Sequence, residues 1–509
     1  MRTSNSIKNS ISAFICSATS LFISFIAQSL FIRFLGVDYL GLNGLFTNIL
    51  TMLSIFELGI GNAIIFNLYK PISEDNIELI KSLMLFYKKS YRIICITILC
   101  FAVFLVPFLK YIVGSVSVDI NINAIYFLFL ISTLCSYLLA YKRNLLYANQ
   151  KNYIINFIHL IYIVFLNSVQ IAIIYLTKNY YLYLIIKIVF QVLENVLITI
   201  FANKMYPYLN DKKIKPLDKS IEKDIFKKVK GLLFHKIGSI VVDGTDNILI
   251  SMLLGVRHVG LYTNYNLIIS SVKTVFSQSI SSVTPSVGDL LVNSNCKERF
   301  RVFSRIRFIN FWISTIVSIC ILLMIEPFIS FWIGKEYVLD KFVLIVLIFN
   351  FYQKMARNPY GSFKESAGIF VEDRFVPIME SIVNIISSII LFYRFGLAGI
   401  FMGTIVSGLC LWCYSYPKFV YVNLFKRSYL EYYKETLGYI LLFVSIALLC
   451  LVVSDQVYVN NCFLNLVFGG IISITIPNLI IIILFRRTEN YIYFIGIIKN
   501  LKGKLMRGM

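Results

Sequence analysis

The sequence predicts an all-α polytopic membrane protein with about 14 transmembrane helices, which form two pseudo-symmetric six-helix lobes around a central cavity plus two C-terminal helices. Three observations predict this fold: the composition, the spacing of apolar runs and an internal repeat. Of the 509 residues, 58% are hydrophobic and 15% are charged, and the mean hydropathy is +0.78. One water-soluble core could not bury that much apolar surface, so the chain is expected to cross a membrane many times.

Fourteen apolar runs have the length of roughly 20 residues that crosses about 30 Å of hydrocarbon as a helix. The tenth run ends in the polar stretch 353–359, so 12 or 13 spans also fit the pattern. The predicted spans are 10–33, 43–69, 91–113, 122–141, 153–176, 181–203, 230–254, 259–288, 308–333, 339–358, 375–393, 397–417, 435–454 and 462–485.

The distribution of Lys and Arg tests this segmentation, because cytoplasmic loops of membrane proteins are enriched in both residues. If the N-terminus is cytoplasmic, 38 of the 48 Lys and Arg residues fall on inner segments. This asymmetry favours an even number of spans with both termini in the cytoplasm. The outer segments carry only seven: Arg33, Lys110, Lys178, Arg257, Lys335, Lys341 and Arg394.

The net charge of +22 does not indicate a nucleic-acid partner, because Lys and Arg lie in short runs between apolar segments rather than along one groove. The ten cysteines are scattered and mostly within apolar runs. Neither a disulfide framework nor a metal site is therefore expected, and no cofactor is predicted.

An internal repeat divides the chain. Residues 35–48, LGVDYLGLNGLFTN, align with residues 254–267, LGVRHVGLYTNYNL, at an offset of 219. Each segment lies at the predicted outer turn between two long helices, as expected for parallel halves related by a pseudo-twofold axis along the membrane normal. The predicted domains are an N-terminal lobe at 1–205, a basic cytoplasmic linker at 206–229, a C-terminal lobe at 230–425, and helices 13 and 14 with a basic tail at 426–509.

Polar side chains concentrate on the two repeat-related helix pairs, predicted spans 1, 2, 7 and 8, and we find no comparable stripe on spans 3, 4, 9 or 14. A polar cavity between the lobes explains this concentration. Ser and Thr stripes also serve helix packing, and Asp243 and Asp246 could instead neutralise Lys236 and Lys273 in a structural ion-pair network. The stripes are Ser17, Ser20, Ser24 and Gln28; Thr47, Thr51, Ser54 and Glu57; His235, Lys236, Ser239, Asp243, Asp246 and Asn247; and Ser270, Lys273, Thr274, Ser277, Gln278 and Ser281.

Two further charged positions bear on the site. Glu57 stands in the middle of the second span, where a carboxylate costs about 2.5–3.5 kcal/mol even on insertion scales and therefore indicates a pathway, a partner or a proton. Lys187 lies near the outer end of the sixth span, where its side chain is expected to reach the headgroup region. Glu194, seven residues later on the same face, is expected to be a structural partner rather than a proton relay.

Four segments carry a family resemblance: FLGVDYLGLNGLFTNILTMLSIFELGIGNAIIFNLYKP, KSLMLFYKKSYR, DGTDNILISMLLGVRHVGLYTNYNLI and FGLAGIFMGTIVS. From about residue 10 to 425 the chain resembles the polysaccharide repeat-unit flippases, the O-antigen and capsule exporters of the multidrug/oligosaccharidyl-lipid/polysaccharide superfamily. The resemblance implies a V-shaped cavity lined by helices 1, 2, 7 and 8. It also implies transfer of undecaprenyl-pyrophosphate-linked oligosaccharides from the cytoplasmic to the outer leaflet of a bacterial plasma membrane, by alternating access.

The implied function assigns roles to the cavity candidates. Lys236, Lys273 and Arg33 are candidates for the anionic headgroup, and Glu57, Asp243 and Asp246 are candidates for coupling to H⁺ or Na⁺. The implied partners are the lipid-linked oligosaccharide, the bilayer, and the polysaccharide polymerase and chain-length machinery. The remaining substrate-binding candidates are Gln28, Asn43, Asn48, Asn62, His235 and Gln278.

Two rival interpretations remain open. A multidrug exporter of the same fold is expected to have acidic cavity walls that bind organic cations. The cavity candidates of this sequence instead include both carboxylates and basic side chains. A membrane polysaccharide polymerase usually needs a sizeable outer loop or a carboxylate and metal motif, and the longest predicted outer loops have about a dozen residues. The sequence therefore predicts a transporter rather than an enzyme.

Overall fold

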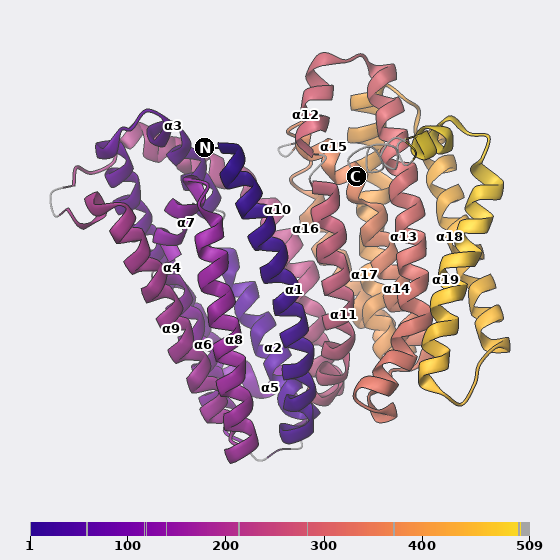
Figure 1. Cartoon of the computed structure of the whole chain (residues 1–509), viewed down its shortest axis with the longest axis horizontal. Helices are drawn as coiled ribbons and strands as arrows, with labels where there is room; N and C mark the ends of the chain where they lie inside the picture. Colours follow the sequence, from indigo (N-terminus) through magenta and orange to yellow (C-terminus); the bar gives the residue numbers. More distant parts are fainter. Residues whose placement is uncertain are drawn as a thin grey trace, which may run out of the picture. The chain divides into compact units, whose positions relative to one another are not determined.

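The computed structural model describes residues 2–57, 60–116, 118, 120–138, 140–211, 214–281, 284–369, 372–496 and 499. All regular structure in these residues is helical (Figure 1). The helices form two compact units, Met1–Thr263 (unit 1) and Asn264–Met509 (unit 2).

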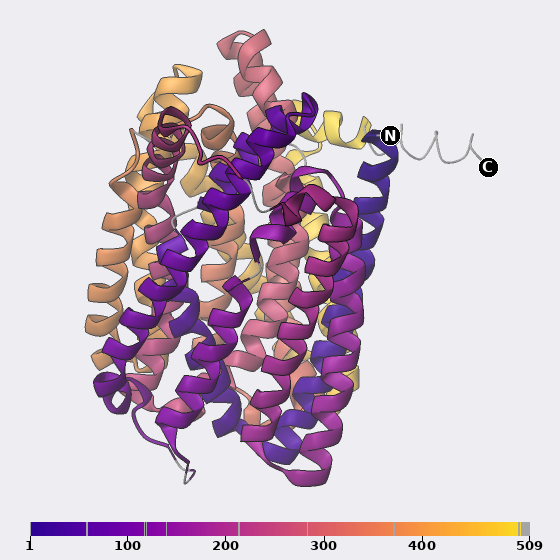
Figure 2. The same cartoon turned by 90° about the vertical axis from the view of Figure 1, so that its left-hand side faces the viewer.

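Unit 1 is built from long helices that run side by side. Figure 2 shows these helices facing the viewer. Within it α1 packs on α8, α9 packs on both α6 and α8, and α10 packs on α2. Its elements are α1 (Arg2–Leu35), α2 (Val37–Leu53), η1 (Ser54–Glu57), α3 (Ile60–Ser73), α4 (Ile77–Leu105), η2 (Val106–Phe108), α5 (Leu109–Val113), α6 (Ile122–Leu138), α7 (Ala140–Ala148), α8 (Asn152–Thr177), α9 (Tyr180–Met205), η3 (Pro207–Asn210), α10 (Lys219–Leu254) and the start of α11 (Val256–Ser281).

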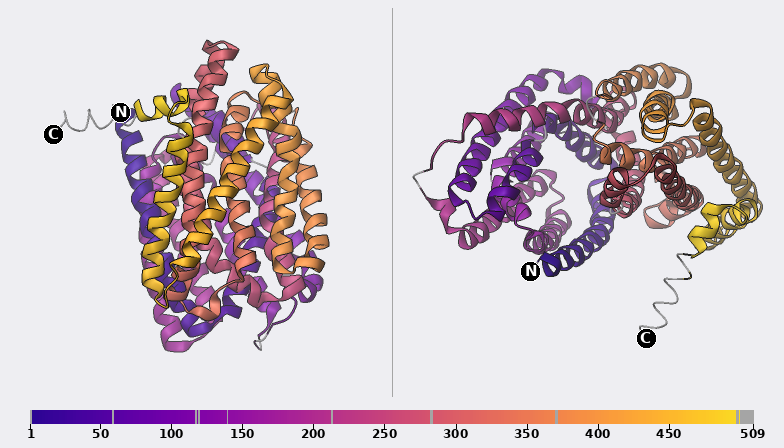
Figure 3. Two further views of the ribbon diagram at one scale, coloured as in Figure 1. Left: turned by 90° about the vertical axis from the view of Figure 1, so that its right-hand side faces the viewer. Right: turned by 90° about the horizontal axis from the view of Figure 1, so that it is seen from above.

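Unit 2 holds the rest of α11 and the helices that follow. In it α16 packs on α17, α13 contacts α14 and α19, and α18 lies beside α19 at the edge of the unit (Figure 3). Its elements are α12 (Thr284–Asn293), α13 (Cys296–Trp332), η4 (Lys335–Tyr337), α14 (Lys341–Ala356), α15 (Asn358–Ser366), α16 (Val376–Phe395), α17 (Leu397–Cys410), the π-helical segment η5 (Leu411–Leu424), α18 (Tyr429–Gln456) and α19 (Cys462–Phe485).

Side-chain caps explain where many of the helices begin. A cap residue accepts hydrogen bonds from the first free backbone N–H groups of its helix, which a membrane helix cannot leave unsatisfied. Asn179, for example, accepts from the N–H groups of Tyr181 and Leu182 and so starts α9 at the turn after α8. The capping residues are Asn76, Asn179, Asp218, Asn295, Asp340, Ser428 and Asn461.

The described residues contain 11 helices that are long and apolar enough to cross a membrane, or 12 if the pair Ile122–Tyr137 and Ala140–Ala148, bent by 40°, is one span. Each predicted run overlaps a helix, but the predicted count of 14 is higher. The run at 339–358 becomes α14, which has only 16 residues before the chain turns into α15. The run at 259–288 becomes α11, whose many polar residues exclude it from the apolar set.

The second predicted span does not keep α-helical hydrogen bonding along its described length, and we call the change at η1 the break of this span. The α-helical hydrogen bonding of α2 ends at Leu53, the 3₁₀ turn η1 follows through Glu57, and α3 begins at Ile60. The sequence accounts for the break, because Gly59 and Gly61 each disfavour a helix interior by about 1 kcal/mol relative to Ala. Leu58 and Gly59 themselves lie outside the described residues.

The two copies of the internal repeat contact each other inside unit 1. Gly36 and Gly255 hold equivalent positive φ angles of 94° and 89° before α2 and α11. A Cβ atom on Gly41 would lie 1.9 Å from the carbonyl oxygen of Val256, and one on Gly260 would lie 2.3 Å from that of Val37. Because Val37 and Val256 are themselves equivalent in the repeat, the contact is reciprocal, as a twofold relationship between the copies requires.

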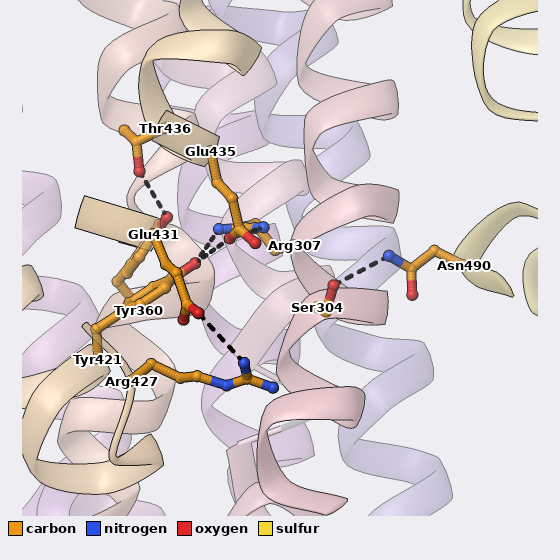
Figure 4. A network of polar contacts seen from close by, with 9 residues as sticks. All are labelled: Ser304, Arg307, Tyr360, Tyr421, Arg427, Glu431, Glu435, Thr436 and Asn490. Atoms are coloured by element: carbon orange, nitrogen blue, oxygen red, sulfur yellow. Dashed lines mark hydrogen bonds and ion pairs between the residues drawn. The ribbon is translucent and has the colours of Figure 1, made fainter. Parts of the chain in front are cut away.

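Polar contacts attach α18 and the segment after α19 to α13 (Figure 4). Buried Arg307 pairs with Glu435 at 2.6 Å and donates to the hydroxyl of Tyr421, which itself donates to Glu435 at 2.6 Å. Asn490 donates to Ser304 at 3.0 Å. The two C-terminal helices expected as an appendage are therefore integral to the packing of unit 2.

Candidate functional site

Glu57 lies at the point where the second span breaks. It is the last residue of η1, and η1 contacts both α4 and α10. Only 25% of the Glu57 side chain is exposed, so the carboxylate lies between helices rather than in open solvent. Broken helices near the bilayer midplane are where transporters of several folds place charged binding groups.

Two side chains from neighbouring helices hold the Glu57 carboxylate. The hydroxyl of Tyr91 on α4 donates to Oε1 at 2.8 Å. The ammonium of Lys236 on α10 lies 3.6 Å from Oε2. Among the described residues, the predicted headgroup cation Lys236 and the predicted coupling carboxylate Glu57 thus form one ion pair, which we call the Glu57 pair.

A chain of hydrogen bonds extends the site away from Glu57. The hydroxyls of Tyr91 and fully buried Tyr87 lie 3.4 Å apart, and the side-chain amide of Asn144 on α7 donates to Tyr87. If Tyr87 donates to Tyr91, every donor along this chain points toward the carboxylate. The Glu57 carboxylate therefore has hydrogen-bonding hydroxyls on one side and a cation on the other.

Gly61 leaves room for the Glu57 carboxylate and the two tyrosine hydroxyls. A Cβ atom at this position would lie 2.9 Å from the hydroxyl of Tyr87, 3.1 Å from Oε1 of Glu57 and 3.3 Å from the hydroxyl of Tyr91. The glycine one turn beyond Glu57 therefore lets the carboxylate and both phenols meet against the backbone of α3.

This arrangement can respond to ions. At membrane depth a Lys and Glu pair is close to neutral overall, so it avoids the cost of one buried charge. A proton or Na⁺ on Glu57, or an anionic group beside Lys236, would compete with the pair and release the opposite side chain. The geometry can thus couple an ion on the carboxylate to an anion at the lysine.

Four of the polar candidates lie apart from the Glu57 pair. Asn43 accepts from the hydroxyl of Tyr180 at 3.4 Å, and it precedes Glu57 by about 20 Å along the helix axis. Arg33 is exposed in the last turn of α1, and Gln28 and Asn48 are half-buried. The polar partners of Glu57 in the described structure do not include any of these four residues.

Asp246 also lies away from the pair. It follows Lys236 by ten residues on α10, about 15 Å farther along the axis, and it is buried in unit 1. Its neighbour Asn247 lies against α2, 3.9 Å from where a Cβ on Gly44 would stand. Lys236 itself is paired with Glu57.

The remaining candidates are Lys273 and four residues whose side chains are not described. Lys273 belongs to unit 2 and is half-buried there. The side chains of Asn62, His235, Asp243 and Gln278 lie outside those that the structure describes.

Sequence reasoning missed the aromatic part of the site. Tyr87 and Tyr91 form an i, i+4 pair on α4 that reaches Glu57, and Ser132 and Ser136 of α6 line a neighbouring cleft, but none of these residues was counted among the polar stripes. The available signal was the tyrosine spacing, which is lost when Tyr is counted as an apolar residue.

Comparisons with known proteins place the fold. Searches with family models and against curated proteins find no match. Among solved structures, the chain is similar to the lipid II flippase MurJ in an inward closed conformation, with a TM-score of 0.65 and 17% identity over 94% of this chain and 99% of that one. The chain therefore shares the fold of that flippase structure.

Two multidrug transporters support the same assignment. An inward-facing MATE family transporter of the MOP superfamily gives a TM-score of 0.54 at 13% identity, covering 77% of this chain and 91% of that one. A point mutant of the Vibrio cholerae MATE transporter VcmN gives 0.53 at 14% identity, covering 84% and 100%. These neighbours are transporters rather than enzymes.

Proposed function

We propose that this chain is a flippase that moves undecaprenyl-pyrophosphate-linked oligosaccharide repeat units from the inner to the outer leaflet of a bacterial plasma membrane, for synthesis of O-antigen, capsule or exopolysaccharide. The observation that carries the proposal is the Glu57 pair at the break of the second span. Two further observations support it: the flippase-like sequence segments and the fold similarity to a protein described as a lipid II flippase.

The Glu57 pair suits an anionic, lipid-linked substrate. The pyrophosphate must leave water and cross hydrocarbon, whereas the polyprenyl tail can stay in the bilayer. Lys236 supplies a cation at depth, and Glu57 neutralises it when substrate is absent. Arrival of the pyrophosphate would displace Glu57, which then takes H⁺ or Na⁺, so the site avoids an unbalanced charge in either state.

The other candidates keep the roles that the family resemblance implies. Arg33 and Lys273 would add charge for the headgroup, and Asp243 and Asp246 remain candidates for ion coupling. Sugars would meet amide and imidazole groups at Gln28, Asn43, Asn48, Asn62, His235 and Gln278. Alternating access would expose these groups to each side of the membrane in turn.

The direct experiment is reconstitution of the purified protein in liposomes with a fluorescent pyrophosphate-linked oligosaccharide. A membrane-impermeant quencher reports the fraction of substrate in the outer leaflet. We expect the full chain to make the inner-leaflet fraction accessible, and the variant Glu57→Gln to do so much more slowly. Equal accessibility with and without protein would contradict the proposal.

An organic-cation exporter is the second candidate, because MATE transporters share the fold. Its best support is the carboxylate at Glu57, but the lysine beside it disfavours a cationic substrate. Uptake of an organic cation driven by an imposed ion gradient, without any lipid-linked oligosaccharide movement, would favour this second function.

A further inference from the structure

Unit 1 contains a polar cleft separate from the Glu57 pair. It lies between α2, α6 and α9 and has a volume of about 270 Å³. Hydroxyl side chains from α2 and α6 face Lys187 and Gln191 of α9 across it. A cleft this polar within membrane-spanning helices indicates an occupant that needs hydrogen bonds.

Lys187 contributes an ammonium without a counter-charge. Its Nζ atom lies 5.2 Å from the centre of the Phe129 ring, a cation–π contact. No carboxylate of the described residues forms an ion pair with it. Glu194, its expected structural partner, instead pairs with Arg143 and His159, each at 2.9 Å. The lysine also lines the cleft, contrary to the expectation that it reaches the headgroups.

Gln191 supplies a second donor. Its Oε1 atom accepts from Ser132 at 2.6 Å, so the amide N–H₂ group faces the other way and has no acceptor among the described residues. Three hydroxyls of the wall are already committed, because Thr51, Thr133 and Ser136 donate to backbone carbonyls of their own helices. Lys187 and Gln191 lie one turn apart on α9, so their donors can meet at one ligand in the cleft.

We propose that this cleft binds a small monovalent inorganic anion of the chloride type, held by the ammonium of Lys187 and the amide of Gln191. One lysine balances one negative charge, whereas a pyrophosphate would leave a net negative charge at membrane depth. The site thus goes beyond the proposed function and does not depend on the substrate of the Glu57 pair.

The cleft is physically linked to the Glu57 pair. Tyr137 lines it, and the ring of Tyr137 lies 5.9 Å from that of Tyr91, which donates to Glu57. Ser54, another lining residue, begins the η1 turn that ends at Glu57. An anion bound in the cleft would therefore lie beside η1, the turn that carries Glu57.

The test is chloride binding to the purified full chain in a neutral detergent, measured by the broadening of the chloride NMR line. We expect saturable broadening that bromide competes away. The variant Lys187→Met should weaken it about tenfold or more, because it removes the charged donor. Gln191→Leu should weaken it less, and Lys187→Arg should retain it.

The control is Lys110→Gln, which removes an exposed lysine of α5 outside the cleft and should bind chloride like the parent chain. Size-exclusion profiles confirm that each variant is folded. Absence of saturable chloride binding, or unchanged binding in folded Lys187→Met, would overturn the proposal. Tighter binding of pyrophosphate than of chloride, lost in Lys187→Met, would overturn the assignment to a monovalent anion while leaving the flippase assay unaffected.

Discussion

Nζ of Lys236 lies 3.6 Å from Oε2 of Glu57, and this contact joins α10 to the break in the second span. The variant Glu57→Gln keeps the size of the side chain and an acceptor for Tyr91 but removes the charge. If the pair couples ions to transport, substrate flipping should be lost at normal protein abundance. The measurement is export or liposome flipping, normalised to the amount of folded protein.

The same variant separates coupling from a purely structural pair. A structural role predicts less folded protein instead, because Lys236 is left at depth without its partner. The double variant Glu57→Gln with Lys236→Met should then recover abundance but not flipping. Full export by normally abundant Glu57→Gln protein would reject both roles.

Gly61→Ala should damage transport although Ala is the better helix former. The added Cβ would come within 2.9 Å of the Tyr87 hydroxyl and 3.1 Å of Glu57, so the hydrogen-bond chain must shift. Gly438→Ala in α18 is the matched control, since nothing lies within 4 Å of its Cβ position. The control should be neutral or stabilising by up to about 1 kcal/mol, measured as thermal unfolding in detergent. Equal flipping rates for the two variants would contradict the prediction that a Cβ atom at position 61 displaces the hydrogen-bonded groups.

Gly260→Ala should strongly reduce the amount of folded protein. Its Cβ would approach the carbonyl oxygen of Val37 to 2.3 Å, and backbone atoms cannot move aside cheaply. Gly41→Ala should have the same effect through Val256. Protein level and melting temperature in detergent check both variants, and parent-like values for either would show that the helices can separate at this contact.

Glu435→Gln should destabilise the chain far more than Asp455→Asn. The first change leaves Arg307, 6% exposed, without its carboxylate, for which about 3–5 kcal/mol is typical. The second breaks the exposed Lys341–Asp455 pair, which is worth about 0–1 kcal/mol. Thermal unfolding of the two single variants measures the order, and similar losses would mean that Arg307 finds another partner.

Orientation in the membrane can be tested with exposed positions. Single cysteines at Arg257 and Gln456 should react with an impermeant thiol reagent in intact cells, and one at Lys215 should react only after lysis. Because native Cys100 and Cys413 are exposed, both must first be replaced. Labelling of Lys215→Cys from outside would reverse the predicted topology.

The apolar runs locate the helices well because a chain in hydrocarbon must satisfy its backbone hydrogen bonds within each helix. The apolar runs are misleading where a predicted span differs from the observed helix in length or in hydropathy. In α11 polar side chains lower the hydropathy of a full-length helix, and α14 stops after 16 residues. A hydropathy profile also does not reveal the break at η1, which depends on local glycines.

For the site, Glu57 and Lys236 could be chosen from the sequence because charges are rare at depth, but their pairing could not. The spacing of Lys187 and Glu194 suggests that they are partners, whereas Glu194 pairs with Arg143 and His159. Which acid meets which base depends on neighbouring helices, and Arg143 of α7 reaches Glu194 from outside the pattern. Tertiary proximity of this kind has no signal along a single chain.

The reciprocal contact between Gly41 and Gly260 bears on how the duplicated halves can diverge. After a duplication, the sequences of the two copies usually diverge independently until their similarity is lost. Here a side chain gained at Gly41 collides with the backbone of the second copy, and one gained at Gly260 collides with the backbone of the first. A side chain at either position is therefore restricted by the backbone of the other repeat copy, so neither copy can change at this contact independently of the other.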